Sequence, residues 1–149
     1  MDITTEIVNK LKSYFDGHRT NNLTDPIEIT SIGVGLDVSV KPTISQLPSV
    51  FFSYGDLRQI RDELVGYDAQ VMTVVIFATV NQTNTEDLIK RCGDMRALVE
   101  TYTNAVRSLG VTEGNVLDAR VRRVVTDKQV VHQYQRMIFM VEVTFEEQL

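Results

Sequence analysis

Apolar residues recur along this 149-residue chain with two different periods, which separates expected helices from expected strands. Residues 2–16 carry apolar side chains three and four positions apart and predict a helix that Asp2 caps and Gly17 ends. Residues 84–109 carry one continuous apolar stripe and predict a second, longer helix. The stripe of this second helix consists of Leu88, Cys92, Met95, Val99, Tyr102, Val106 and Leu109.

Strand-like segments fill most of the remaining chain. Residues 47–56 predict a strand that starts after Pro48 and ends at Gly55, whereas 57–67 fit either a helical turn or an edge strand. Residues 70–80 predict the strongest strand, because apolar side chains occupy both of its faces. Such a strand requires cover on both sides. One face holds Val71, Val75 and Phe77, and the other holds Met72, Val74, Ile76 and Ala78.

The last two strands are expected to form a hairpin. Residues 117–126 and 137–145 are its arms, and the long segment between them either extends the hairpin or projects as a loop. The order of elements predicts an α+β fold, with a mainly antiparallel sheet and both helices packed on one face. We expect a single domain over 1–149, in which 17–46 forms a loop and then a strand or an extended arm.

Composition narrows the class of protein without identifying a reaction. The formal net charge is −5, and one cysteine, Cys92, excludes an internal disulfide. The beginning of the chain does not resemble a signal peptide, and the longest apolar run, 74–78, is far below the roughly 20 residues of a membrane helix. We therefore expect no membrane partner.

Residues that could carry chemistry are few and scattered. His18 and His132 lie in predicted loops, and Cys92 lies on an apolar helix stripe, where a structural thiol is expected. The GVG at 33–35 lacks the rest of a dinucleotide-binding motif. We expect no catalytic site, no metal, no cofactor and no small-molecule substrate.

Arginines cluster in the segment DARVRRVVT, residues 118–126. Residues 117–136 include five basic and two acidic side chains, which gives a local charge of +3 in an acidic chain. A nucleic-acid contact, a solvated strand edge and an assembly surface are all compatible with this pattern. Strict alternation predicts Arg120 and Arg122 on one face, and Arg123 on the other face with Ala119, Val121 and Val125.

More apolar surface is present than two helices can cover. Ile138 and Met140 are predicted opposite the core face of their strand, and Val71, Val75 and Phe77 need a second cover. Either the arm at 27–46 or another subunit supplies that cover. Arg120 and Arg122 are then expected to pair with Glu142 or a nearby acid, in the same chain or in the next. The candidate interface residues are Val71, Val75, Phe77, Arg120, Arg122, Arg123, Arg136, Ile138, Met140 and Glu142.

The order and texture of these segments resemble a known family. An N-terminal helix is followed by LPSVFFSYGD, VMTVVIFATV, the helix TNTEDLIKRCGDMRALVETY, then DARVRRVVT and MIFMVEVTFEE. Over residues 1–147 this arrangement is similar to the tail terminator proteins of long-tailed bacteriophages. The resemblance implies an α+β subunit without catalytic residues that forms a six-membered ring on the finished tail tube.

The resemblance also implies partners and a location. The ring would stop tube polymerisation, contact the tail tube protein and a head connector or stopper protein, and let DNA pass through its lumen without sequence-specific binding. The protein would be part of the virion, at the tail or neck, and would assemble in the host cytoplasm. Another phage neck protein, such as a head-completion protein, stopper or sheath terminator, and a monomeric nucleic-acid-binding module remain alternatives.

Overall fold

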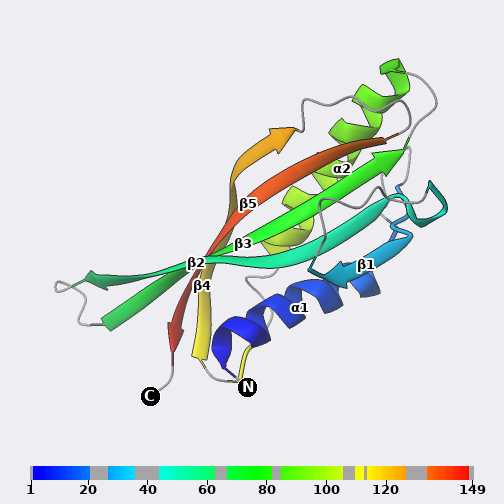
Figure 1. Ribbon diagram of the computed structural model, residues 1–149. Helices are drawn as coiled ribbons and strands as arrows, with labels where there is room; N and C mark the ends of the chain where they lie inside the picture. Colours follow the sequence, from blue (N-terminus) through cyan, green and yellow to red (C-terminus); the bar gives the residue numbers. More distant parts are fainter. Residues whose placement is uncertain are drawn as a thin grey trace.

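The computed structural model describes residues 2–20, 27–35, 44–62, 67–81, 85–105, 110–112, 114–126 and 134–147. Within these residues, two α-helices, one short 3₁₀ helix and five strands follow one another in the order α1, β1, η1, β2, β3, α2, β4, β5 (Figure 1). Their bounds are α1 Ile3–Gly17, β1 Ser31–Val34, η1 Ile44–Gln46, β2 Ser49–Asp62, β3 Tyr67–Asn81, α2 Thr85–Ala105, β4 Gly114–Thr126 and β5 Tyr134–Glu147.

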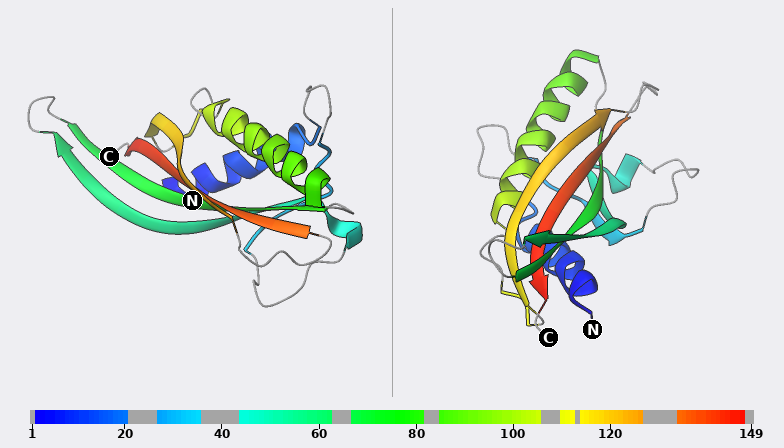
Figure 2. Two further views of the ribbon diagram at one scale, coloured as in Figure 1. Left: turned by 90° about the horizontal axis from the view of Figure 1, so that it is seen from above. Right: turned by 90° about the vertical axis from the view of Figure 1, so that its left-hand side faces the viewer.

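The five strands form one sheet in the order β1-β2-β3-β5-β4. Only the β1–β2 pairing is parallel, and the other three pairings are antiparallel. Both helices lie on the same face of the sheet (Figure 2, left). The predicted α+β fold, with a mainly antiparallel sheet and helices on one face, is therefore confirmed.

The core lies between the helices and the sheet. Phe15 of α1 meets Phe52 of β2 edge-on, with ring centroids 5.1 Å apart, and it meets Tyr102 of α2 at 5.2 Å. The sheet contributes Ile76 and Phe139, which are fully buried. The stripe predicted for the long helix packs here as well, through the fully buried Met95 and Val99.

Local chemistry explains where α1 begins. The Asp2 carboxylate accepts a hydrogen bond from the backbone N–H of Thr5 at 3.0 Å, which satisfies one of the free donors in the first turn. The Thr4 hydroxyl donates to the same carboxylate. Hydrogen bonds from Thr4 and Thr5 lower the pKa of Asp2 to about 2, because they favour its charged form. The predicted cap is confirmed.

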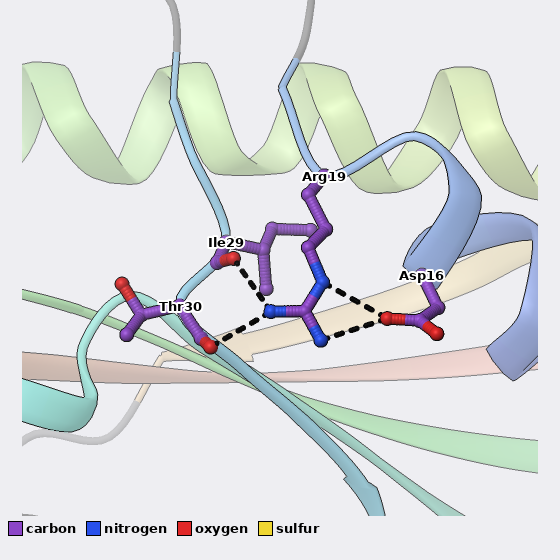
Figure 3. Close-up of polar contacts among 4 residues, drawn as sticks. All are labelled: Asp16, Arg19, Ile29 and Thr30. Atoms are coloured by element: carbon purple, nitrogen blue, oxygen red, sulfur yellow. Dashed lines mark hydrogen bonds and ion pairs between the residues drawn. The ribbon is translucent and has the colours of Figure 1, made fainter.

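Arg19 joins the end of α1 to the chain that leads into β1 (Figure 3). Its guanidinium contacts Asp16 at 2.7 Å and donates to the carbonyl of Thr30 at 2.9 Å. The backbone N–H of Ile29 donates in return to the Arg19 carbonyl at 2.8 Å. Ile27 and Ile29 are thereby buried in the core. The described part of the predicted arm thus extends the sheet edge as β1.

The β2–β3 hairpin is longer than the sequence predicted. Gly55 does not end the strand, since β2 continues through residues 57–62 opposite β3. A register shift between Tyr54 and Leu57 absorbs the irregularity, and Gly55 fits there because an added Cβ would lie 3.0 Å from the Thr73 carbonyl oxygen. The resulting two-stranded ribbon extends beyond both helices (Figure 2, left).

Both ends of the predicted long helix, residue 84 and residues 106–109, lie outside the described residues. Residues 134–136, which the sequence left in the connection between the last two strands, belong to β5. The described part of β5 therefore extends the hairpin beyond the predicted start at 137.

Candidate assembly surface

The sheet face opposite the helices is the candidate site, and we call it the open face. The helix-facing positions of β3 and β5 are buried: Val74, Ile76, Phe139 and Val141 are all without exposed surface. The alternate positions point to the open face, because side chains alternate along a strand. Cross-strand register arranges these alternate positions in rows, with Phe51, Phe77 and Ile138 in one row and Ser53, Val75 and Met140 in the next.

The six predicted interface residues other than the arginines all lie on the open face. Val75, Phe77, Ile138, Met140 and Glu142 are half-buried there, whereas Val71 is only 4% exposed. The register that brings them together pairs Val71 with Thr144, Thr73 with Glu142, Val75 with Met140 and Phe77 with Ile138. The second apolar face predicted for the central strand therefore exists, and it lies in the middle of the sheet.

Two of the four predicted arginines are held by acids of the same chain. Arg120 lies 2.6 Å from the Asp118 carboxylate, and Arg122 lies 2.9 Å from the Glu142 carboxylate. The pairing of Arg122 with Glu142 was one of the expected pairings, and it occurs within one subunit. Partly exposed pairs of this kind contribute about 0–1 kcal/mol, so they neutralise charge more than they stabilise the fold.

The predicted position of Arg123 is wrong. A register shift between Val121 and Arg123 makes Arg122 an extra residue in β4, and Arg123 then pairs with Met140. Val121 pairs with Val141 on the helix side, while Arg120 pairs with Glu142 on the open face. Arg123 consequently shares the open face with Arg120, because the bulge cancels the alternation that a regular strand would have.

Arg123 and Arg136 have no ion-pair partner among the described residues. Arg123 is exposed, whereas Arg136 is 9% exposed and its Nε lacks a hydrogen-bond partner. Arg136 lies opposite Thr79, at the end of the open face away from Glu142. Along β5, Ile138 lies between the two arginine positions, and Met140 is the residue that pairs with Arg123. We call this set, Arg123, Arg136, Phe77, Ile138 and Met140, the arginine-flanked face.

Sequence reasoning missed a second surface, which lies on the ribbon. Tyr54 is 49% exposed and Leu57 is 47% exposed, and Asp56 between them is exposed too. Both apolar residues pair with buried positions of β3, Val74 and Met72, so they point to the helix side of the sheet. Asp56 lies in the bulge opposite Thr73 and therefore belongs to the open-face side, so we call Tyr54 and Leu57 the ribbon shoulder.

A groove of about 340 Å³ separates the ribbon shoulder from α1. Tyr54 and the exposed Val34 form one wall, and Val8 with Asn9 contributes to the other. The sequence carried a signal for this surface, since residues 57–67 also fit an edge strand that would continue β2 past Gly55. The alternation breaks at Gly55, and a glycine inside a strand pattern usually marks its end or a bulge, so the sequence predicts a strand end there.

The described residues contain no group of three or more His, Cys, Asp or Glu side chains that could hold a metal ion. The Cys92 thiol is partly buried on α2, and burial raises its pKa, which disfavours the reactive thiolate. Among the described helices, none is both long and apolar enough to cross a membrane.

Comparison with known proteins bears on the fold. No family model matches the chain, and no curated protein matches it. A chain of the solved structure of the virion of a native gene transfer agent (GTA) particle is similar, with a TM-score of 0.53 and 14% sequence identity over 78% of this chain and 79% of that chain. At this identity the likeness establishes a shared fold.

Proposed function

We propose that this protein is a structural virion protein, a tail terminator that forms a ring at the junction of head and tail. The observation that carries the proposal is the open face, a half-buried apolar surface in the centre of a sheet whose helices both lie on the other side. A subunit of an assembly needs such a surface, whereas a monomer normally covers it. The fold shared with a chain of the GTA virion particle supports the same class.

The proposed mechanism is capping. One face of the ring binds the growing end of the tail tube, and the other face cannot template a further ring of tube protein and instead binds the head connector. DNA passes through the lumen without sequence-specific contact. Net charge −5 suits that passage, because a strongly cationic channel would bind the phosphate backbone.

Tube polymerisation in the presence of this protein tests the proposal. Tail tube protein from the same genome is allowed to polymerise with and without the protein, and tube lengths are measured by negative-stain electron microscopy. Shorter tubes with this protein bound at one end are the expected result. A length distribution that does not change at excess protein, combined with no density at tube ends, would refute the capping function.

The alternative function is binding of mixed-sequence DNA through the arginines of the open face. Arg120 and Arg122 are each neutralised by a carboxylate of the same chain, which leaves them weak candidates for phosphate contacts. We expect no binding of a DNA duplex at physiological salt by fluorescence anisotropy. Binding that disappears in the variant Arg120→Glu with Arg122→Glu would favour a nucleic-acid-binding module instead.

A further inference from the structure

We propose that an extended peptide segment of a partner protein binds as an added strand beside β2, in the groove between the ribbon shoulder and α1. Its backbone pairs with Tyr54, and its alternate side chains, which are apolar and uncharged, lie against Val34 and Val8. This site is on the helix side of the sheet. It goes beyond the proposed function, which is carried by the open face.

Tyr54 carries the backbone groups that an added strand needs. The N–H of Gly35 donates to the carbonyl of Phe52 at 2.8 Å, so the backbone groups of Phe52 point to the outer edge of β2. Backbone groups alternate between the two edges of a strand, and the register is still regular at Tyr54, which pairs with Val74. The N–H and the carbonyl of Tyr54, two residues after Phe52, therefore point to the same outer edge.

The edge strand β1 stops just before this position. Its last residue, Val34, pairs with Phe52, and Gly35 then takes a positive φ of 78°, which ends the extended conformation. Among the described residues, no strand pairs with the outer edge of β2 at Tyr54. A segment that continues the line of β1 can bond both backbone groups of Tyr54, as peptides do when they add to a sheet edge.

The groove beside this edge selects the side chains of the occupant. It has a volume of about 340 Å³, and its lining residues are all uncharged: Thr4, Thr5, Val8, Asn9, Val34 and Tyr54. Val34 is 58% exposed, and it points to the helix side as Tyr54 does. An extended segment alternates its side chains, so every second one enters the groove. Apolar side chains gain from burial there, whereas a charged one loses water without an ion-pair partner in the lining.

The opposite edge of the sheet, β4, is a poor donor of this strand from a second copy. Two register shifts interrupt β4, and the exposed arginines along it are Arg120, Arg122 and Arg123. Bulges and charged side chains are devices that block pairing at a sheet edge. The arginines also do not suit an uncharged groove. A different protein with an uncharged extended segment is therefore the partner that the groove fits.

Titration with a synthetic peptide tests the groove. In the probe, valine and threonine alternate over about eight positions, the length of an ordinary strand, with a lysine at each end for solubility. Main-chain hydrogen bonds supply the affinity in strand addition, so the probe does not need the sequence of the natural partner. In amide nuclear magnetic resonance spectra, the expected shifts are concentrated at Val8, Val34 and Tyr54. Exchange of the Tyr54 amide hydrogen with solvent is expected to slow.

Two controls distinguish strand addition from general adhesion. The same peptide with every backbone nitrogen methylated keeps its side chains and loses its donors, so it is expected to bind about tenfold more weakly or worse. Val34→Asp places a charge at the groove and is expected to weaken binding of the probe about tenfold. Ile89→Asp, at a 70% exposed position of α2, is the matched control and is expected to bind like the wild type.

Three results would overturn the site: no binding of the probe at about millimolar concentration, equal binding of the methylated peptide, or unchanged affinity in Val34→Asp. Self-association of the wild type that Val34→Asp abolishes would assign the groove to a second copy and overturn it as well. The measurement needs no tail tubes. A protein that caps tubes and does not bind the probe keeps the proposed function and loses this site, and the reverse result separates the two in the other direction.

Discussion

Neighbouring residues of β5 on opposite faces of the sheet give the sharpest prediction about the open face. Val141 is fully buried between Val74 and Val121, whereas Met140 lies half-buried on the open face opposite Arg123. We consider the same substitution at both sites, Val141→Glu and Met140→Glu. The side chain introduced, the strand and the local sequence are then matched, so only the face differs.

The expected magnitudes follow from burial. Val141→Glu removes a valine worth about 1.5–3 kcal/mol of apolar burial and adds the cost of a buried carboxyl group, so the total is several kcal/mol. A domain of this kind has a total stability of about 5–15 kcal/mol, and the variant is expected to be largely unfolded or markedly destabilised. Met140→Glu loses only part of a methionine surface and gains an attraction to Arg123, so the expected cost is about 1 kcal/mol or less.

Urea denaturation followed by circular dichroism measures both free energies of unfolding. Met140→Glu should keep a cooperative transition near that of the wild type, because this side chain lies on the open face and not in the core. A Met140→Glu variant as unstable as Val141→Glu would refute the assignment of the open face, since it would mean that Met140 is part of the core. Equal, small losses of stability in both variants would instead refute the placement of Val141 in the core.

Further predictions concern individual groups. Asp2→Ala should lower the unfolding midpoint above pH 4, and the difference from the wild type should fade as pH falls from about 3.8 towards 2. The reason is that folding lowers the pKa of Asp2, so its stabilising effect is lost when the carboxylate is protonated. A difference that persists at pH 2 would contradict this. Glu6→Gln should cost about 1–3 kcal/mol in urea denaturation, because the buried carboxylate accepts from both the backbone N–H and the hydroxyl of Thr112; unchanged stability would contradict it. Gly33→Ala should destabilise by about 1–3 kcal/mol, since the new Cβ would lie 2.8 Å from the ring of Phe51; a neutral effect would show that this ring moves freely.

Periodicity predicted the elements well where one period persisted over many residues. The helix stripe through Met95 and Val99 is buried as expected, and the two faces of β3 separate as the alternation of Val74 and Val75 predicted. These predictions succeed because a long regular element repeats its geometry at every turn or pleat. The position of each side chain then depends only on counting from its neighbours.

Prediction failed where a bulge interrupts the regular alternation of side chains along a strand. The bulge before Arg123 adds one residue to β4, and alternation then assigns every later side chain of this strand to the wrong face. At Gly55 the error was of another kind. The sequence predicted that the strand ends there, whereas the pairing of β2 with β3 continues after a register shift. Both irregularities depend on the partner strand, and no property of the bulged segment alone fixes them.

The two failures, at Gly55 of β2 and before Arg123 of β4, have a common cause. Bulges change the direction of side chains without ending a strand, so they allow a sheet to present residues that a regular strand would bury or turn away. At β4 the bulge places Arg123 beside Met140, and at β2 the shift leaves Tyr54 and Leu57 on the same side of a projecting ribbon. A sheet needs regular pairing for stability, and these irregular points are where it can present unlike surfaces for assembly.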